Sequence, residues 1–414
     1  METKEYRLKQ VTEKITKGTT PSNIGESFTE EGIMYFRSEL IGKSKYIDKS
    51  DGLLFISNET HEKLKRSQIQ KNDLLFSMAG IYLGKISLVG DEDFPANTNQ
   101  AVAIIRFNSK EIDLEYVYYY MTQRWYNIYI NSLTAQAAQP NINLEQIGNL
   151  KLNLPPLPTQ QKIASILSAY DNLIQNYKKQ IEALQTAASE LYKEWFVRFR
   201  FPGWQNAKFE NGIPEGWKVE RLGNLAEIKS GKRLPQGYDF SDYPTRHPYI
   251  RARDIKHGNI DSNDFAYISD EVYQKLKRYI VDENDILLTI VANIGDVGYV
   301  NKSLQGFNLT ENAVRLTNYS KRIEPRYLCY YLSQPATKIY MEGLAVGAAQ
   351  AKLGIYKIET IKVLLPNINI QKDFSRRITL IHTKIDNLNK QITNLTQQRD
   401  LLLPRLISGK LELK

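Results

Sequence analysis

Two stretches of the sequence repeat one pattern, a proline-broken entry followed by a long segment with an apolar stripe. Leu154–Ile174 reads LPPLPTQQKIASILSAYDNLI, and Leu365–Ile385, 211 positions further along, reads LPNINIQKDFSRRITLIHTKI. Other matches keep the same order at offsets of 211 to 214: Tyr35-Phe36-Arg37 with Tyr249-Ile250-Arg251, Asn72–Phe76 with Asn284–Leu288, Thr98–Val102 with Thr310–Val314, and Tyr116–Gln123 with Tyr327–Gln334. So many ordered matches exclude chance. The chain is two copies of one unit, each a globular part followed by a long helix.

The long segments have the 3.5-residue period of a coiled-coil seam, because apolar residues alternate spacings of four and three. In the first copy the seam is Ile163, Leu167, Tyr170, Ile174, Tyr177, Ile181, Leu184, Ala188, Leu191 and Trp195. In the second copy it is Phe374, Ile378, Ile381, Ile385, Leu388, Ile392, Leu395, Arg399, Leu402 and Leu406. Arg399 is the one polar member of the two seams.

Prolines bound these helices. Pro155, Pro156 and Pro158 predict that the first helix starts no earlier than Thr159, which would be its N-cap. Pro366 marks the second entry in the same way, and Pro404 predicts a disturbance of the last turns of the second helix.

The order of the parts predicts their topology. The first helix runs into the second globular part, and that part ends where the second helix begins. If the part is compact, its two ends are close, so the helices return on each other as an antiparallel coiled coil with pseudo-two-fold symmetry. We therefore expect an α/β (α+β) fold with a first globular domain at 1–153, a helix at 154–200, a second domain at 201–364 and a helix with a C-terminal tail at 365–414. About 34 helical residues would form a spacer of roughly 50 Å.

The globular parts mix strand and helix patterns. Asn72–Val89 and Asn284–Val300 combine β-branched or aromatic residues with Gly and Asn punctuation, which is typical of strands joined by tight turns. Asp113–Ile130 (DLEYVYYYMTQRWYNIYI) predicts one helix whose apolar face holds Leu114, Val117, Met121 and Trp125 or Ile128. Its tyrosines could stack on bases, but aromatic packing of a buried helix is the more economical interpretation.

Composition and charge set broad limits on the partner and the compartment. The formal net charge is +9 with a pI of about 9.1, which suits an acidic partner such as nucleic acid without proving one. A single cysteine, Cys329, cannot form an internal disulfide, the first residues lack an apolar signal core, and no segment is apolar enough to span a membrane. These features predict a cytoplasmic protein.

No catalytic constellation emerges from the sequence. Asn153–Leu157 (NLPPL) differs from the Asn-Pro-Pro-aromatic loop of amino-methyltransferases, because Leu154 intervenes and Leu157 replaces the aromatic residue. No phosphate-binding Gly-Lys loop is present, and the four histidines lack metal-ligand spacing with Cys329 or with one another: His61, His247, His257 and His382. Asp285, Asp296 and Glu311 are carboxylates of the kind that a nuclease site uses. Asp73 and Asp285, however, occupy equivalent positions of the repeat before apolar strands, where a turn-capping role explains them. We expect no catalytic residue, no metal site and no cofactor bound by this chain.

Two readers on one basic chain suit a bipartite duplex target, since a 50 Å spacer corresponds to roughly 15 base pairs. Base and phosphate contacts need Arg, Lys, Asn, Gln, Ser or Thr on loops. The predicted DNA-binding residues are Lys17, Thr19, Thr20, Arg37, Ser38, Lys43, Asn97, Asn99 and Gln100 in copy one, and Lys232, Arg233, Arg251, Arg253, Lys256, Asn308 and Asn312 in copy two. Any one of these could instead be a solvated surface group, and the repeat position shared by Arg37 and Arg251, or by Gln139 and Gln350, also fits a structural role.

The arrangement resembles the specificity subunit of type I restriction-modification systems across nearly the whole chain. The motifs that carry the resemblance are the LPPLPTQQ helix entry, the run PYIRARDI at Pro248–Ile255, and the ending LLLPRLISGKLEL. The resemblance implies two target recognition domains, each reading one half of a split, asymmetric DNA sequence. The family often has an acidic residue before the glutamine of the helix entry, where this chain has Thr159 and Ile370, and copy two has Pro366-Asn367 in place of a double proline. These departures bear on subunit docking and leave the architecture unchanged.

The resemblance also implies partners and a division of chemistry. The paired helices would dock two methyltransferase (modification) subunits, which in turn support two restriction (translocase) subunits. S-adenosylmethionine, ATP and magnesium would be bound by those partners, and this chain would be non-catalytic. We further expect a partner-docking surface on the outward helix faces that includes Trp195, Phe196 and Phe199, and hence poor solubility of the chain alone.

Two other functions fit the sequence less well. A single-chain methyltransferase or nuclease would need a cofactor fold for which the two matched domains leave no room. A coiled-coil scaffold that binds only proteins would show no affinity for duplex DNA.

Overall fold

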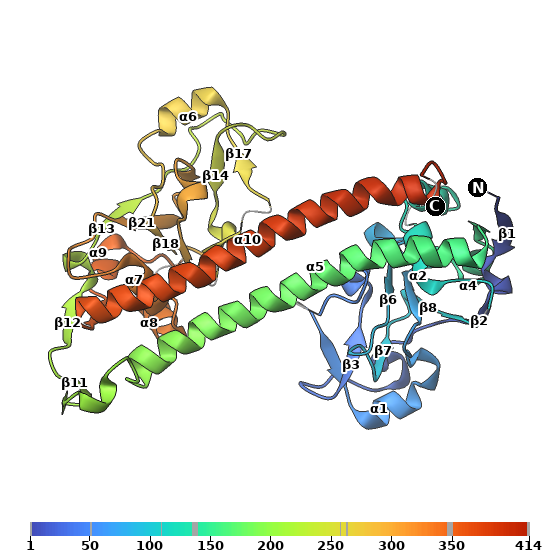
Figure 1. Cartoon of the computed structure of the whole chain (residues 1–414), viewed down its shortest axis with the longest axis horizontal. Helices are drawn as coiled ribbons and strands as arrows, with labels where there is room; N and C mark the ends of the chain where they lie inside the picture. Colours follow the sequence, from blue (N-terminus) through green and yellow to red (C-terminus); the bar gives the residue numbers. More distant parts are fainter. Residues whose placement is uncertain are drawn as a thin grey trace. The chain divides into compact units, whose positions relative to one another are not determined.

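The computed structural model of the chain (Figure 1) describes residues 2–49, 52–108, 110–134, 140–256, 258–261, 264–345 and 351–411. The chain divides into two compact units. Unit 1 comprises Met1–Lys178 and Asn389–Lys414, and unit 2 comprises Lys179–Leu388. Each long helix therefore contributes one half to each unit.

Unit 1 contains a four-stranded antiparallel sheet in the order β2-β8-β5-β6 and a three-stranded sheet in the order β4-β3-β7. The strands of the first are β2 (Thr12–Lys17), β8 (Val102–Phe107), β5 (Leu74–Ser77) and β6 (Ile86–Leu88). Those of the second are β4 (Leu54–Ile56), β3 (Ile33–Phe36) and β7 (Ala96–Thr98), with β3 and β7 parallel. Every residue of β5 is buried, as expected for a central strand covered on both faces.

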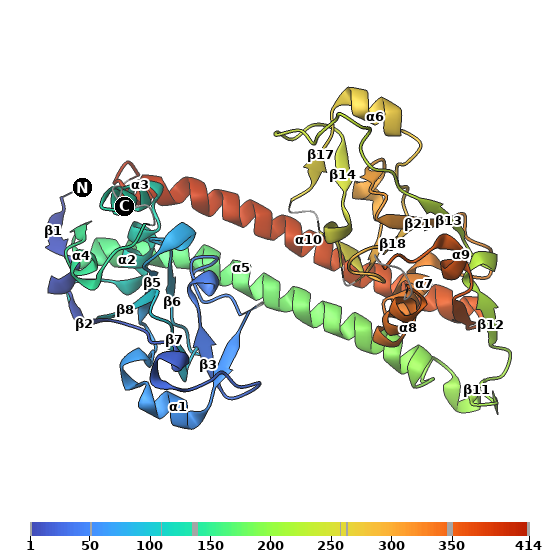
Figure 2. The same ribbon diagram turned by 180° about the vertical axis from the view of Figure 1, so that it is seen from behind.

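Unit 2 repeats this plan, which confirms the internal repeat (Figure 2). Its four-stranded sheet has the order β13-β21-β18-β19, and its three-stranded sheet the order β17-β14-β20, again with one parallel pair, β14 and β20. The strands are β13 (Glu227–Ser230), β21 (Ala313–Thr317), β18 (Ile286–Thr289), β19 (Val297–Tyr299), β17 (Ala266–Tyr267), β14 (Pro248–Ile250) and β20 (Asn308–Leu309). Two short hairpins are added, β10 (Phe209–Glu210) with β11 (Ile213–Pro214) and β15 (Ile255–Lys256) with β16 (Asn259–Ile260).

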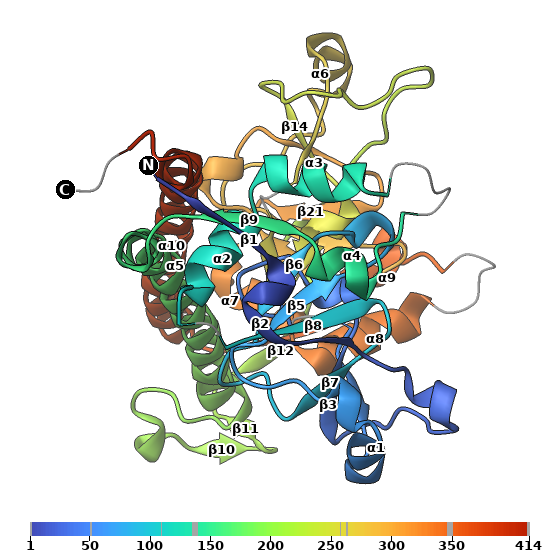
Figure 3. The ribbon, with the colours of Figure 1, turned by 90° about the vertical axis from the view of Figure 1, so that its right-hand side faces the viewer.

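Short helices complete both units in matching places. Unit 1 has α1 (Asn58–Lys63), α2 (Leu114–Met121), α3 (Arg124–Ser132) and α4 (Leu144–Gly148). Unit 2 has α6 (Asp270–Leu276), α7 (Pro325–Leu332), α8 (Pro335–Ala345) and α9 (Ile355–Glu359). In unit 1, α2 lies between the four-stranded sheet and α5 (Leu157–Tyr192) (Figure 3), and all three contribute to one core cluster.

The two ends of each globular part are paired with each other. The first strand, β1 (Lys4–Arg7), is antiparallel to β9 (Lys151–Leu154), which leads directly into α5. In unit 2, β12 (Lys218–Arg221) is antiparallel to β22 (Lys362–Leu365), which leads into α10 (Ile368–Ile407). The premise that the ends of the second globular part lie close together is therefore confirmed.

Contacts inside each unit show that the long helices are antiparallel. In unit 1 the first half of α5 meets the last half of α10, where Asp171 pairs with Arg399 and Leu406 joins the core that holds Leu167. In unit 2 the last half of α5 meets the first half of α10, and the rings of Tyr192 and Phe374 lie 5.9 Å apart. All the predicted seam positions are buried or half-buried, so the 3.5-residue period located the seam correctly.

The predicted helix start is wrong by two residues, because α5 begins at Leu157 and includes Pro158. The first-turn amides of a helix have no intrahelical partner, so a proline there costs no hydrogen bond. Pro404 likewise lies inside α10, which continues to Ile407. The predicted disturbance does not end the helix, because Leu406 and Ile407 are buried in the core of unit 1 and hold the last turn.

The glutamine of each helix entry has a structural role. Gln160 is 1% exposed, donates its side-chain amide to the carbonyls of Pro155 and Glu111, and accepts the backbone N–H of Asp113. Gln371 makes the same set of bonds in unit 2, to Pro366, Arg322 and Glu324. Each glutamine thus ties the start of a long helix to the residue before α2 or α7.

The single helix predicted over Asp113–Ile130 is two helices, α2 and α3, separated at Thr122–Gln123. The break rotates the second part, so Trp125 and Ile128 are 49% and 60% exposed, while Tyr126 and Ile130 are buried. The interpretation of the tyrosines is confirmed, because Tyr116, Tyr118, Tyr119 and Tyr120 all lie in the core of unit 1.

The partner-docking surface expected at Trp195, Phe196 and Phe199 is also wrong. Trp195 and Phe196 are 5% and 4% exposed, and Phe199 packs against the same core of unit 2. The helix changes to a π-helical turn at Lys193–Val197, which directs both buried rings toward Phe374.

Candidate nucleic-acid interface

Two loops of unit 1 meet at a glycine. A Cβ on Gly18 would lie 2.0 Å from the carbonyl oxygen of Thr98, so only glycine permits this approach. The contact is extended by Thr20, whose hydroxyl bonds to Gln100, and by Tyr35, which donates to the carbonyl of Thr19 at 3.1 Å. The segment after β2 is thereby fixed against the turn between β7 and β8.

Unit 2 builds the same junction from different side chains. A Cβ on Gly231 would lie 2.0 Å from the carbonyl oxygen of Thr310. Tyr249 donates to the carbonyl of Lys232 at 2.7 Å, and Arg233 lies 3.7 Å from Glu311. We call residues 17–20 with 98–100, and residues 230–233 with 310–312, the recognition loops of units 1 and 2.

The recognition loops share a backbone plan but not their polar side chains. Aligned on the two glycines, Thr19 and Thr20 of unit 1 correspond to Lys232 and Arg233 of unit 2. Aligned on the TNQAV and TENAV motifs, Asn99 and Gln100 correspond to Glu311 and Asn312. Gln100, Lys232 and Arg233 are exposed, whereas Lys17, Thr19, Thr20, Asn99 and Asn312 are half-buried. The same scaffold therefore presents different hydrogen-bonding groups in the two units.

The repeated arginine has different surroundings in the two units. Arg251 is held by Asp254 in a bidentate pair at 3.0 Å and also bonds to the carbonyl of Asp264. Leu40 takes the place of Asp254 in unit 1. Among the residues that the structure describes, Arg37 donates a 3.4 Å bond to the carbonyl of Gly52, and its buried Nε has no partner. A buried donor without a partner costs free energy, so of the two arginines Arg37 is the better placed to donate a hydrogen bond to an external ligand.

The other predicted residues divide between exposed groups and internally bonded ones. Lys256 is exposed. Lys43 lies 3.5 Å from Asp48, Arg253 lies 2.9 Å from Asp264, and Ser38 donates to Glu39 at 3.3 Å. Surface pairs of this kind are weak and leave the cations available to a phosphate.

Asn97 and Asn308 require a correction, because both are buried, at 0% and 1% exposure. The amide of Asn97 donates to the carbonyl of Leu64 and to Ser67, and the amide of Asn308 donates to the carbonyl of Leu276. Each asparagine fastens β7 or β20 to the end of α1 or α6, so these two side chains belong to the interior. Gln139 and Gln350 lie outside the described residues.

The carboxylates that might have suggested a nuclease have structural partners. Asp73 accepts the backbone N–H of Gln70 and pairs with Arg106 at 2.7 Å, and Asp285 accepts the backbone N–H of Asp282 and pairs with Arg315 at 3.0 Å. The turn-capping interpretation is confirmed. Among the described residues, no group of three or more His, Cys, Asp or Glu side chains is arranged to hold a metal ion.

Sequence reasoning missed two features, the internal bonds of the buried asparagines and the different surroundings of Arg37 and Arg251. The signal in the sequence for the second feature was that Leu40 stands where copy two has Asp254, three residues after the shared arginine.

Two units with one scaffold and unlike recognition loops define a class of protein with two related recognition modules. A family model described as the type I restriction modification DNA specificity domain matches residues 1–186 and 214–397. The chain therefore belongs to that family. It is a specificity subunit, a DNA-binding and non-catalytic component that works with methyltransferase and restriction subunits.

Individual relatives agree with this assignment. The chain is 26% identical to the type I restriction enzyme MjaIX specificity subunit of Methanocaldococcus jannaschii, over 99% of this chain and 94% of the relative. It is 29% identical to the putative MjaX specificity subunit of the same organism, over 98% and 93%. The crystal structure of a type I S subunit from M. genitalium covers 98% of this chain and 96% of its own at a TM-score of 0.60 and 18% identity, which supports the fold. No helix within the described part of the chain is long and apolar enough to cross a membrane.

Proposed function

We propose that this chain binds a split, asymmetric duplex sequence, with one half-site read by each unit. The observation that carries the proposal is the pair of recognition loops. Their glycine crossings and tyrosine bonds are the same, while Thr19 and Thr20 are replaced by Lys232 and Arg233, and Asn99 by Glu311. A shared backbone with unlike side chains is what two readers of unlike half-sites require, because bases are distinguished by hydrogen-bonding groups.

The long helices would set the spacing of the half-sites. A helix of 36 residues, such as α5, extends for about 54 Å at 1.5 Å per residue. This length corresponds to roughly 16 base pairs at 3.4 Å each, which is about one and a half turns of the duplex.

The paired helices would also dock the catalytic subunits, two methyltransferase and two restriction subunits, in the cytoplasm. Exposed apolar residues on these helices support docking there, namely Leu173 on α5 and Leu380 and Leu401 on α10. S-adenosylmethionine, ATP and magnesium would bind to those subunits.

The test is a genome-wide map of methylated adenine in the host, with and without this gene. One split motif should lose its methylation when the gene is deleted. Thr19→Lys with Thr20→Arg should then change one block of the motif, and the reciprocal exchange, Lys232→Thr with Arg233→Thr, should change only the other. Motifs that are unaffected by deletion, or one exchange that alters both blocks, would contradict the proposal.

A further inference from the structure

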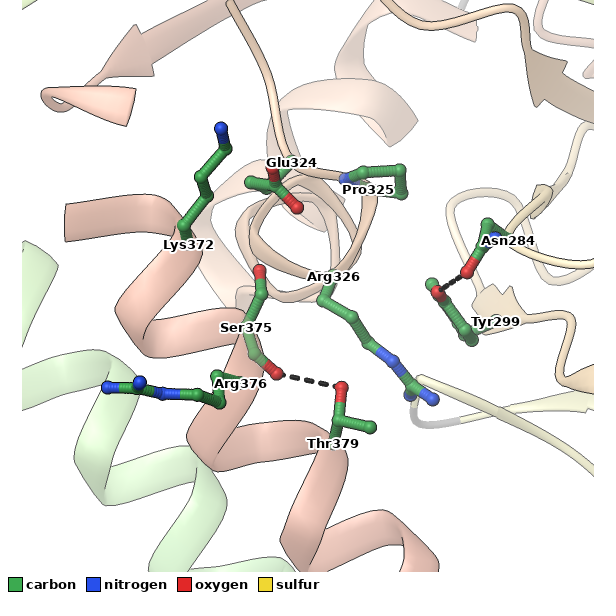
Figure 4. Close-up of a pocket in the computed structure, with 9 residues that line it drawn as sticks. All are labelled: Asn284, Tyr299, Glu324, Pro325, Arg326, Lys372, Ser375, Arg376 and Thr379. Atoms are coloured by element: carbon green, nitrogen blue, oxygen red, sulfur yellow. Dashed lines mark hydrogen bonds between the residues drawn. The ribbon is translucent and has the colours of Figure 1, made fainter. Parts of the chain in front are cut away.

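Unit 2 contains a pocket of about 340 Å³ where α7 meets the first turns of α10 (Figure 4). Its nine lining residues include three cations, Arg326, Lys372 and Arg376, and one carboxylate, Glu324. Arg326 comes from the first turn of α7, and Lys372 and Arg376 lie one turn apart on α10. The lining therefore carries an excess of two positive charges.

Two of these cations have no counter-ion within the part of the chain that the structure describes. Among the described residues, no carboxylate pairs with Arg326 or Lys372, whereas Arg376 pairs with Asp373. The guanidinium of Arg326 lies 3.6 Å from the ring centre of Tyr299, and the hydroxyl of Tyr299 bonds to Asn284. The stacking fixes the direction of Arg326 while leaving its N–H groups free of acidic partners.

One of the lining residues also carries a buried hydroxyl. Ser375 is 8% exposed, and its Oγ has no hydrogen-bond partner within the described structure. Figure 4 shows Ser375 among the lining side chains beside Arg326. A buried polar group without a partner costs free energy, so a ligand that accepts a hydrogen bond from this hydroxyl would be favoured.

The equivalent place in unit 1 is neutralised internally. At the repeat offset of 211, Arg326 corresponds to Glu115 and Ser375 to Ala164. Glu115 pairs with the buried Lys45 at 2.5 Å. Unit 1 thus supplies both charges of an ion pair from its own residues, whereas unit 2 supplies only the cation and adds a hydroxyl donor.

We propose that this pocket binds a carboxylate side chain of the methyltransferase subunit, a contact that rests on the docking proposed above. The donors are of the kind that recognise an oxyanion: a guanidinium, an ammonium and a hydroxyl. None of the residues of the unit 2 recognition loop lines the pocket, while four of the lining residues belong to α10. A side chain on a flexible stem can enter a recess whose arginine is half-buried, which favours a protein carboxylate over the phosphates of a duplex.

The test titrates the full chain with the methyltransferase subunit of the same system. Arg326→Gln should weaken binding about 30-fold, because the buried carboxylate would lose its main partner, and exposed Lys372→Gln should weaken it only a few-fold. Lys277→Gln, which changes an exposed lysine at the end of α6 that does not line the pocket, is the matched control and should leave the affinity unchanged. Protection of Cys329 from alkylation checks that unit 2 remains folded in each variant.

Each outcome has a distinct meaning. Weaker docking by Arg326→Gln, with unchanged affinity of the assembled complex for DNA, supports the inference. Wild-type docking by Arg326→Gln and Lys372→Gln overturns it, and so does a loss of DNA affinity without a loss of docking, since the oxyanion would then be a DNA phosphate. If the wild-type chain does not bind the methyltransferase subunit at all, the proposed docking function fails first and this inference falls with it.

Discussion

The ion pair between Asp171 and Arg399 makes a sharp test of how the helices pair in unit 1. Asp171 is buried, with an 8% exposed side chain, and uses both carboxylate oxygens, one toward Arg399 and the other toward the hydroxyl of Tyr119. Arg399 is 26% exposed and is the polar member of an otherwise apolar seam. In unit 2 the corresponding positions hold His382, which bonds to Tyr330, and the buried Ala188. The pair therefore specifies which helix halves meet.

The expected loss in the free energy of unfolding depends on which buried polar group each substitution leaves without a partner. Arg399→Leu leaves a buried carboxylate without its cation and should cost about 3 kcal/mol, the lower end for a broken buried pair because Arg399 is partly exposed. Asp171→Leu should cost about 1 kcal/mol, since Tyr119 loses its acceptor while Arg399 can turn to water. The double variant should also cost about 1 kcal/mol, because two leucines complete the seam and only Tyr119 is left unpaired. The coupling energy is then about 3 kcal/mol.

Native-state hydrogen exchange on peptides from 157–178 and 389–407 measures these opening free energies within unit 1 alone. Arg405→Leu removes another arginine from the same helix at an exposed position and should change stability by less than about 0.5 kcal/mol. A coupling energy below about 0.5 kcal/mol, or an Arg399→Leu variant as stable as the wild type, would refute the reasoning.

Three further predictions concern single residues. Gly18→Ala and Gly231→Ala should each weaken DNA binding at least tenfold in a filter-binding assay, because the new Cβ would displace a recognition loop. Gly237→Ala is the control, since a Cβ there meets nothing within 4 Å and only the backbone strain of its positive φ is added. This variant should leave DNA affinity unchanged. Burial, together with the charge of Arg326, lowers the pKa of His382 from 6.5 to about 4. Between pH 6.5 and pH 4 the unfolded chain therefore binds a proton at His382 that the folded unit does not. The free energy of unfolding of unit 2 should fall by up to about 3 kcal/mol as the pH drops from 7 to 4. His382→Gln should reduce this pH dependence in urea titrations. Burial raises the pKa of the Cys329 thiol to about 12, so iodoacetamide should react with it only when unit 2 opens, and rapid alkylation of the native protein would contradict this.

The sequence alone determined the repeat, the helix seams and the antiparallel return of the helices. These depend on periodicity and on the order of segments along the chain, and both are properties of a linear string. The 3.5-residue spacing located the buried face of α5 and α10, and the glutamines at 160 and 371 stood at equal distances from a proline in both copies.

Tertiary structure decided the surroundings of individual side chains. Asparagine is a residue type that reads bases, but Asn97 and Asn308 lie in the interior, where each connects a strand to the end of a helix. Phe196 lies outside the predicted seam, but a π-helical turn directs its ring into the core. The role proposed for Arg326 depends on the fact that, within the described part of unit 2, no carboxylate forms an ion pair with it, although Glu324 lines the same pocket. Such differences depend on which distant segments meet, because burial and charge pairing are set by neighbours in space, and the sequence pattern records only neighbours along the chain.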